Sequence, residues 1–321
     1  MTNFKESAKD ETHYTIAFYN LENLFDLYDD ERTNDNDFLK TSVKNWTHKR
    51  FQNKLRKLGY TISQIGRTET EKHPAVIGVC EVENSSALNS LMTSKHLANL
   101  PYDFVHYDSP DERGIDVALI YDTTVFNVNT SETFSVHLVD ERGETDYTRD
   151  ILLVSGLLDG EEMHFIVNHW SSRREGQKES ENKRLASSKK VGEIIIALRE
   201  YDAHAKIIVM GDFNDDPSNT SIKNLVENYK LFNPMATLRS YNRGTTRHNK
   251  QWNLFDQILF TTNFFGVEEN TLQYGEADIF DEDFLKSHNG KFKGTPYRTY
   301  VGKRYKGGYS DHFPVYMTLK K

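Results

Sequence analysis

The chain has 321 residues, of which 27% are charged and 37% are hydrophobic, and its formal net charge is −8. This balance is typical of a water-soluble globular protein and excludes disordered and fibrous chains, and it means that a polyanionic partner must be bound by a local basic patch. A single cysteine, Cys80, excludes an internal disulfide framework and favours a reducing compartment.

The first residues set the expected domain boundaries. Residues 1–13 are polar and charged and lack the apolar run of a signal peptide, so we expect a flexible tail there and one domain over residues 14–321. No stretch approaches the roughly 20 apolar residues of a membrane span, so no stable membrane insertion is expected. We expect a cytoplasmic monomer; the alternative is a secreted protein whose leader has been removed.

Apolar, β-branched and aromatic runs predict ten strands, at residues 14–19, 75–79, 104–107, 116–121, 134–138, 151–157, 164–168, 206–210, 255–260 and 315–319. Apolar residues at three- and four-residue spacing predict helices at 49–66, 86–98, 179–201 and 218–228. Two ranges rich in turn formers, 233–253 and 280–295, are predicted as long surface loops. Many strands with few long helices favour a layered α+β fold.

Two predicted strands near the amino terminus end in polar residues. The first runs into Asn20 and Glu22, which share a face because they are two residues apart. The second runs into Glu81. A carboxylate at the end of an apolar run costs free energy unless it is paired or metal-bound, so Glu81 is a candidate metal ligand. The alternative for Glu81 is a solvated acidic strand end.

The middle of the chain carries two further groups of polar residues at strand ends. His169 follows an apolar run and precedes Arg173 and Arg174, whose guanidinium groups suit phosphate. The sharpest local signal is a Gly-Asp-Phe-Asn turn, where Asp212 can orient or deprotonate a water and Asn214 can hold a phosphate oxygen. The alternative is an Asx turn that caps the following helix.

The last third of the chain supplies an aspartate inside a strand and an Asp-His dipeptide. Asp256 lies in an apolar run and needs a partner if it is buried; a histidine suits it, because the carboxylate then fixes the imidazole tautomer. We expect that partner to be His312. Its neighbour Asp311 suits a hard cation, and Arg298 in a late loop is a candidate phosphate ligand.

In this order the residues resemble the motif series of the endonuclease/exonuclease/phosphatase superfamily, over residues 14–319. The resemblance implies a four-layered α/β/β/α sandwich of two packed, mainly antiparallel sheets flanked by helices. It also implies in-line attack of water on a phosphate ester, with Mg²⁺ as cofactor and Mn²⁺ as a substitute, and no covalent enzyme intermediate. Glu22 stands where relatives often carry Asp or Asn.

The resemblance implies roles for these residues. The implied metal ligands are Asn20, Glu22, Glu81 and Asp311, of which Glu81 is the principal carboxylate. The implied catalytic residues are His169, Asp212, Asn214, Asp256 and His312. Among these, Asp212 resembles the water-orienting base, and His312 with Asp256 resembles the His/Asp pair opposite the metal. The arginines expected to bind substrate phosphate are Arg173, Arg174 and Arg298.

The substrate is a phosphate ester whose identity depends on the loops, because superfamily members hydrolyse DNA, RNA, inositol phosphates and phosphosphingolipids. Gln257 and Asp215 stand where the inositol-polyphosphate branch carries arginines, which disfavours that branch. Basic residues interleaved with tyrosines in the late loops, including Lys303 and Arg304, favour an endo- or exonuclease that acts on nucleic acid. The alternatives are a small-molecule or lipid-headgroup phosphatase or phosphodiesterase and, in another class, a catalytically silent binding module.

Overall fold

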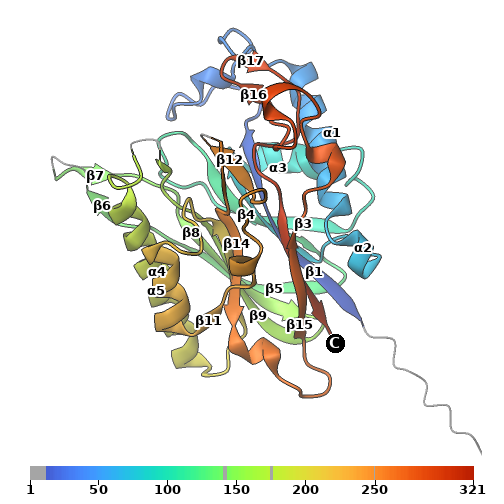
Figure 1. Cartoon of the computed structure of the whole chain (residues 1–321), viewed down its shortest axis with the longest axis vertical. Helices are drawn as coiled ribbons and strands as arrows, with labels where there is room; N and C mark the ends of the chain where they lie inside the picture. Colours follow the sequence, from blue (N-terminus) through green and yellow to red (C-terminus); the bar gives the residue numbers. More distant parts are fainter. Residues whose placement is uncertain (1–11, 140–142, 174–175, 249) are drawn as a thin grey trace, which may run out of the picture.

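The computed structural model describes residues 12–139, 143–173, 176–248 and 250–321. Two six-stranded sheets lie face to face, with helices on both outer sides (Figure 1). The helices beside the first sheet are α1 (His48–Gln64), α2 (Arg67–Thr70) and α3 (Ser85–Met92). Those beside the second sheet are α4 (Glu181–Tyr201) and α5 (Thr220–Tyr229). The predicted four-layered α/β/β/α sandwich is confirmed.

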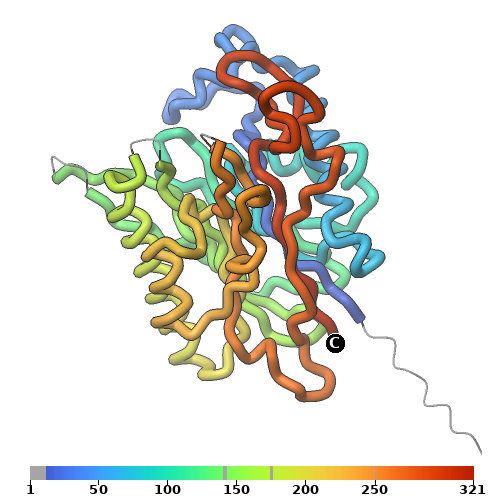
Figure 2. The backbone as a smooth tube through the Cα atoms, viewed as in Figure 1, coloured from blue at the N-terminus to red at the C-terminus, as the bar shows by residue number. Residues whose placement is uncertain are grey.

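The first sheet has the strand order β15-β18-β1-β2-β4-β3. Its strands are β1 (His13–Leu24), β2 (Val76–Val82), β3 (Tyr102–His106), β4 (Asp116–Asp122), β15 (Gln273–Ile279) and β18 (Val315–Lys320). Strands β1 and β2 are parallel, and the other neighbours are antiparallel. Because β1 pairs with β18, the beginning and end of the described chain lie side by side (Figure 2).

The second sheet repeats this pattern with the order β11-β14-β10-β9-β8-β5. Its strands are β5 (Phe126–Phe134), β8 (Ile151–Leu158), β9 (Glu161–His169), β10 (Ile207–Asp212), β11 (Leu231–Phe232) and β14 (Asp256–Thr261). Strands β9 and β10 form its one parallel pair among the described residues. Parallel strands end at the same edge of a sheet, so each sheet gathers the polar residues that follow its central pair at one edge.

The two sheets pack through a continuous apolar core. Gly78 of β2 faces Met210 of β10, and a Cβ placed on Gly78 would come within 2.5 Å of the Met210 sulfur, so the sheets approach closely there. On the outer face of the second sheet, Ile194 and Ile195 of α4 and Leu225 of α5 complete a separate apolar layer. The central strands are therefore packed between apolar layers on both faces.

Several sequence expectations were wrong in detail. No strand spans 134–138, because β5 ends at Phe134. Strands β5 and β15 were missed because both are edge strands with many polar residues. Helix α3 ends at Met92 instead of residue 98. His13 already belongs to β1, which shortens the expected tail, and residues 1–11 of that tail lie outside the described part of the chain.

The connections carry short elements. These are η1 (Asn36–Phe38), β6 (Leu138–Val139), β7 (Thr145–Asp146), η3 (Pro234–Thr237), β12 (Thr246–His248), β13 (Gln251–Asn253), η4 (Thr262–Phe265), η5 (Asp283–Leu285), η6 (Gly290–Phe292), β16 (Tyr300–Val301) and β17 (Arg304–Tyr305). The predicted loop 233–253 therefore contains the β12–β13 hairpin. Among the described residues, no helix has the length and apolar character needed to cross a membrane.

Candidate active site

Three of the predicted residues lie on one rung of the second sheet. Asp212 at the end of β10 is paired with His169 of β9 on one side and with Asp256 of β14 on the other. Residues directly opposite each other in neighbouring strands project from the same face of a sheet. All three are buried, and strand pairing therefore brings together residues that are far apart in the chain.

The first sheet contributes Asn20, whose side chain forms a hydrogen bond to the second sheet. The Asn20 Nδ2 donates a hydrogen bond of 3.0 Å to Asp212 Oδ2. Its Oδ1 accepts from the backbone N–H of Glu22 at 2.8 Å. Asn20 is thus fixed at both ends, and it holds one oxygen of Asp212 in a defined position.

Glu81 reaches the site from an irregular point in β2. Its φ is 61°, in the left-handed region, and the pairing of β2 with β4 shifts register between Cys80 and Val82. Such a bulge re-aims a side chain and stores strain that only a well-determined environment maintains. The Glu81 Oε2 accepts from the backbone N–H of Asn23 at 2.9 Å, and Oε1 lies 3.9 Å from His169 Nε2. The carboxylate is therefore directed toward the site.

His312 and Asp256 form the predicted contact. The segment before β18 lies beside the end of β1, because these strands are antiparallel, and His312 Nδ1 lies 2.7 Å from Asp256 Oδ2. The same nitrogen is 3.9 Å from Asp212 Oδ2, and Nε2 is 4.0 Å from Asp311 Oδ1. Burial by itself lowers the pKa of His312, but Asp256 and Asp212 outweigh it and raise that pKa well above its ordinary value. The two carboxylates therefore favour the protonated form of the imidazole.

Asp212 has the environment of a base that works near neutral pH. Burial raises the pKa of its carboxyl, His312 opposes the rise and Asp256 adds to it, and the net result is a pKa of about 7. The Asp212 Oδ1 accepts from the backbone N–H of Asn214 at 3.0 Å, which is an Asx turn. The alternative function of that turn as a helix cap is wrong, because α5 begins only at Thr220. Asn214 itself lies at φ 49° and donates from Nδ2 to the Trp170 carbonyl at 3.0 Å.

Glu22 is directed away from the cleft toward a buried lysine. Its Oε2 accepts from the backbone N–H of Thr299 and lies 3.8 Å from Lys54 Nζ. Lys54 is 1% exposed and donates to Thr299 Oγ1 and to the Tyr309 carbonyl, both at 2.7 Å. Burial raises the pKa of Glu22 to about 7, Asp311 adds to the rise, and Lys54 opposes it. Glu22 therefore supports the segment that leads to Asp311.

The predicted arginines differ in what they contact. Arg298 lines the cleft, with Nη2 3.6 Å from Asp311 Oδ2. Arg173 also borders the cleft, but it donates to the Asn214 carbonyl at 2.7 Å and to Asp215 Oδ1 at 2.8 Å, so these contacts already use two of its nitrogens. Arg174 lies outside the described residues.

Sequence reasoning missed Arg113 and Lys54 at the site, whereas the polar loop over residues 233–253 was expected to contribute basic residues. Arg113 lines the cleft and donates from Nη2 to Asn23 Oδ1 at 2.6 Å. Arg247 and His248 reach the cleft from the β12–β13 hairpin. Lys54 could have been identified, because it lies on the apolar face of α1, three residues after Phe51 and four before Leu58.

The cleft above these residues has a volume of about 740 Å³ and is lined from both sheets. Glu81 and Asp311 both face it, and carboxylate oxygens are the ligands that Mg²⁺ prefers. Cys80, His169 and Asp212 also lie close enough to share a metal, but burial and then Asp212 raise the pKa of the Cys80 thiol well above its ordinary value. A protonated thiol is a poor ligand, so the carboxylates are the better fit to a hard cation.

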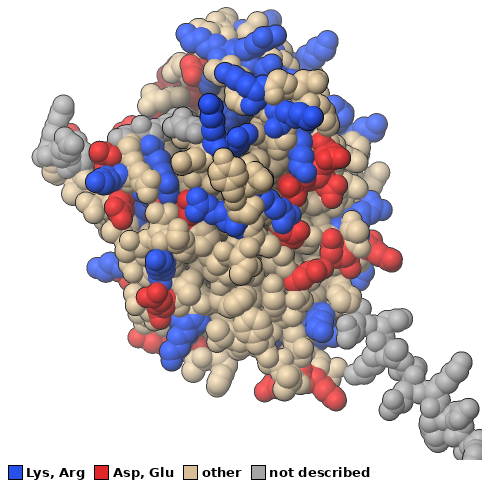
Figure 3. All heavy atoms as spheres, viewed as in Figure 1, with Lys and Arg blue, Asp and Glu red and all other residues tan. Residues whose placement is uncertain are grey.

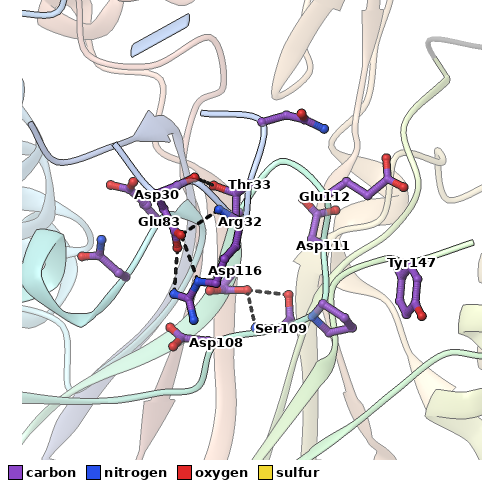
Figure 4. Close-up of a pocket in the computed structure, with 14 residues that line it drawn as sticks. Asp30, Arg32, Thr33, Glu83, Asp108, Ser109, Asp111, Glu112, Asp116 and Tyr147 are labelled. Atoms are coloured by element: carbon purple, nitrogen blue, oxygen red, sulfur yellow. Dashed lines mark hydrogen bonds and ion pairs between the residues drawn. The ribbon is translucent and has the colours of Figure 1, made fainter. Parts of the chain in front are cut away.

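A second cavity, of about 660 Å³, shares the 111–114 loop with the cleft, because Asp111, Glu112 and Gly114 line the cavity and Arg113 lines the cleft. Figure 4 shows the side chains that line this cavity. The carboxylates that line it belong to Asp30, Glu83, Asp108, Asp111, Glu112 and Asp116. Among its described lining residues, Arg32 is the one lysine or arginine, and it is paired with Asp30 at 2.8 Å. This negative lining repels a phosphate ester, and the cleft at Asp212 is therefore the candidate active site.

Residues 15–321 match the model of a family described as Endonuclease/Exonuclease/phosphatase family. The solved structures similar to the chain include an endonuclease/exonuclease/phosphatase family protein from Bacteroides thetaiotaomicron, with 19% identity and a TM-score of 0.61 over 97% of this chain and 98% of that one. A mannosyl-6-phosphatase from Bacteroides thetaiotaomicron has 18% identity and a TM-score of 0.58 over 95% and 99% of the two chains. D. rerio TDP2 complexed with single strand DNA product has 13% identity and a TM-score of 0.57 over 96% and 99%. No curated protein matches the sequence significantly.

Proposed function

The chain belongs to the endonuclease/exonuclease/phosphatase family, whose members are phosphoric ester hydrolases such as nucleases and phosphatases, and we therefore propose that it hydrolyses phosphodiester bonds with Mg²⁺ as its metal. The observation that carries the proposal is the connected set Asn20, Asp212, His312 and Asp256, which spans the two sheets at the floor of the cleft. A buried carboxylate beside a mostly buried imidazole supports the roles of base and charge-stabilising partner, the pair of groups that water attack on phosphorus requires.

Asp212 is the proposed base. A water above it loses a proton to the carboxylate while its oxygen attacks phosphorus, and the ester P–O bond opposite breaks. Asn20 and the backbone N–H of Asn214 fix the two carboxylate oxygens, so the base does not need to reorient during the reaction.

His312 is the proposed electrostatic partner of the phosphoryl group. Asp256 accepts from its Nδ1, which leaves Nε2–H to donate to a phosphate oxygen. His169 and Asn214 border the same cleft and are proposed to contact the remaining oxygens. Arg298 is the proposed phosphate ligand at the rim, whereas the contacts of Arg173 favour a structural role.

Glu81 and Asp311 are the proposed metal carboxylates, with Asn20 and Glu22 in supporting positions. A bound divalent metal would stabilise negative charge on the phosphoryl and leaving oxygens. Mg²⁺ commonly takes one or two protein carboxylates and keeps several waters, which agrees with two carboxylates at an open cleft. Glu22 is already held by Lys54 and Thr299, so its contribution is to the position of its neighbours.

The test is hydrolysis of a panel of substrates with Mg²⁺ or Mn²⁺ and with a chelator. The panel includes single- and double-stranded DNA, RNA, bis-p-nitrophenyl phosphate, p-nitrophenyl phosphate, hexose 6-phosphates and sphingomyelin. Metal-dependent cleavage of the diesters is the expected result. Cleavage of monoesters alone would replace the proposal with a small-molecule phosphatase, the second candidate, which the fold likeness to a mannosyl-6-phosphatase supports. Metal binding without cleavage of any substrate would favour the alternative function, a catalytically silent binding module.

A further inference from the structure

Basic side chains cover the β16–β17 hairpin and the neighbouring part of α1. We call this surface the hairpin patch; it consists of Arg50, Lys57, Lys303, Arg304 and Lys306. The hairpin contacts α1 directly, because Asn53 Nδ2 donates to the Tyr305 hydroxyl at 3.0 Å. Lysine and arginine side chains gather at the end of the molecule where β16 and β17 lie (Figure 3).

Tyrosine rings alternate with the cations of this surface. The Arg50 guanidinium lies 4.5 Å from the centre of the Tyr305 ring. Lys57 Nζ lies 4.3 Å from the centre of the Tyr309 ring and 4.9 Å from that of Tyr297. Surfaces that bind single strands combine cations, which hold phosphates, with aromatic rings, on which bases stack. The hairpin patch has both components.

The positive charge of the hairpin is not neutralised locally. Within the part of the chain that the structure describes, no carboxylate lies within 4.0 Å of the charged groups of Lys303, Arg304 or Lys306. By contrast, Arg243 in the preceding loop is paired with Asp278 at 2.6 Å. The pKa of Lys57 is lowered to about 8, chiefly by burial and then by the nearby charges of Arg56 and Lys54. The contribution of these two neighbours is expected where positive charges outnumber negative ones.

The hairpin patch continues directly from the cleft. Arg298 lines the cleft, and its carbonyl accepts from the backbone N–H of Gly308 at 3.2 Å, which closes the base of the hairpin. One residue further, Thr299 is bound by both Lys54 and Glu22. The hairpin is therefore anchored to the same residues that support Asp311, and a chain leaving the cleft past Arg298 would meet its cations.

From this geometry we infer that the hairpin patch binds the phosphate backbone of single-stranded nucleic acid beyond the scissile phosphate. The inference rests on the proposed function and deepens it, since it identifies the substrate as a chain with several phosphates. With a formal net charge of −8, the protein can hold such a chain only through a local patch of this kind. An anionic membrane would also attract the cations, but the half-exposed tyrosines and the continuity with the cleft favour a nucleic acid.

The test compares the triple variant Lys303→Glu/Arg304→Glu/Lys306→Glu with a matched control, Lys189→Glu/Lys223→Glu/Lys230→Glu, whose exposed lysines lie on and next to α4 and α5. Binding of a labelled single-stranded oligonucleotide of about 12 nucleotides is measured by fluorescence anisotropy in chelator over a series of salt concentrations. The hairpin variant should bind at least about tenfold more weakly, and its salt slope should fall by about 2, since each lost contact removes about 0.7. The control should retain most of the affinity.

Hydrolysis distinguishes this inference from the proposed function. Turnover of bis-p-nitrophenyl phosphate, which has a single phosphate, should be the same in the hairpin variant and in the unchanged protein, whereas kcat/KM on the oligonucleotide should fall with its affinity. If neither protein hydrolyses the diester but oligonucleotide binding still depends on the hairpin, the proposed hydrolysis is wrong, whereas the inference that the hairpin patch binds nucleic acid is supported.

Two outcomes would overturn the inference: unchanged oligonucleotide binding by the hairpin variant, and an equal loss of binding in the matched control. If oligonucleotide binding is unchanged and the hairpin variant no longer sediments with phosphatidylserine vesicles, the patch is assigned to membranes. The milder variant Lys303→Gln/Arg304→Gln/Lys306→Gln guards against misfolding, and it should show an intermediate loss of affinity at an unchanged Tm.

Discussion

At the scale of single residues, the role proposed for each carboxyl group of the site follows from the groups that surround it. Asp212 is held by two hydrogen bonds from amide groups next to the His312 imidazole, whereas Glu22 is held by the buried Lys54 and a backbone N–H. The same side-chain chemistry is therefore proposed to act as a base at Asp212 and as a structural support at Glu22. Two predictions separate these uses.

The first prediction concerns the base. Asp212→Asn keeps the shape of the side chain and removes its ability to accept a proton, so kcat on bis-p-nitrophenyl phosphate should fall about 10²- to 10⁴-fold. Tm should fall only modestly, because the single amide oxygen can keep one of the two hydrogen bonds that Asn20 Nδ2 and the backbone N–H of Asn214 donate to Asp212, while a buried carboxyl group is removed. Steady-state kinetics and thermal melts measure the two quantities. Turnover close to that of the unchanged protein would remove Asp212 from the mechanism.

The second prediction concerns the buried ion pair. Lys54→Met leaves Glu22 without its ammonium partner, and breaking a buried pair by removing one member costs about 3–5 kcal/mol. Lys54→Met combined with Glu22→Gln should recover much of this loss, because no uncompensated charge remains. Urea denaturation of the two single variants and the double variant gives the coupling energy. Purely additive effects would show that the two side chains do not interact.

Residue chemistry could predict only part of the site. The contact between His312 and Asp256 could be predicted, because a carboxylate inside an apolar strand needs a partner and histidine suits it. The orientation of Glu22 could not, since it depends on the backbone N–H of Thr299, 277 residues away. A short motif carries no information about such a distant partner.

At the scale of elements, the central parallel pairs are what bring the motifs together. Strands β1 and β2 in one sheet and β9 and β10 in the other all carry polar residues of the site toward their carboxyl ends. Their apolar runs made these strands predictable from sequence, whereas the polar edge strands β5 and β15 were not. The bulge at Glu81 was also unpredictable, because a register shift depends on the partner strand.

The third prediction tests how closely the sheets pack. Gly78→Ala places a methyl group against the Met210 sulfur and the Phe18 ring, and such overpacking typically costs about 1–3 kcal/mol. The matched control is Gly266→Ala, at φ −58°, where the nearest atom to a new Cβ lies 3.2 Å away. Urea denaturation should show a clear loss for the first variant and a much smaller change for the second. Equal stability of the two variants would contradict close packing at Gly78.

At the scale of the whole molecule, charge is distributed unevenly. The net charge is −8, yet a basic hairpin borders the cleft while a cavity lined by carboxylates shares the 111–114 loop with the cleft. From the composition, a polyanion can be bound only by a local basic patch. The fold agrees with that expectation, because Arg113, Arg247 and Arg298 all line one cleft.

The fourth prediction concerns the metal and global stability. Glu81, Asp212 and Asp311 all line one cleft, so a divalent cation that binds there should interact favourably with their carboxylates and stabilise the folded protein. Because a ligand that binds only the folded state stabilises it, Mg²⁺ at about 100 times its Kd should add about 2.7 kcal/mol to the free energy of unfolding. Thermal melts in Mg²⁺ and in chelator, at matched ionic strength, measure this gain. The fold itself should persist in chelator, because Glu81 and Asp311 each retain a protein partner.

Glu81→Gln separates binding at the cleft from a general effect of divalent ions. The amide removes one negative charge from the proposed metal carboxylates and can still accept from the backbone N–H of Asn23, so the metal-free protein should be as stable as before or more so. Its Tm should then respond to Mg²⁺ much less than that of the unchanged protein. The matched control is Glu83→Gln in the acidic cavity, which should leave the Mg²⁺ response intact. A full response in Glu81→Gln together with a lost response in Glu83→Gln would place the metal in the acidic cavity and not beside Asp212.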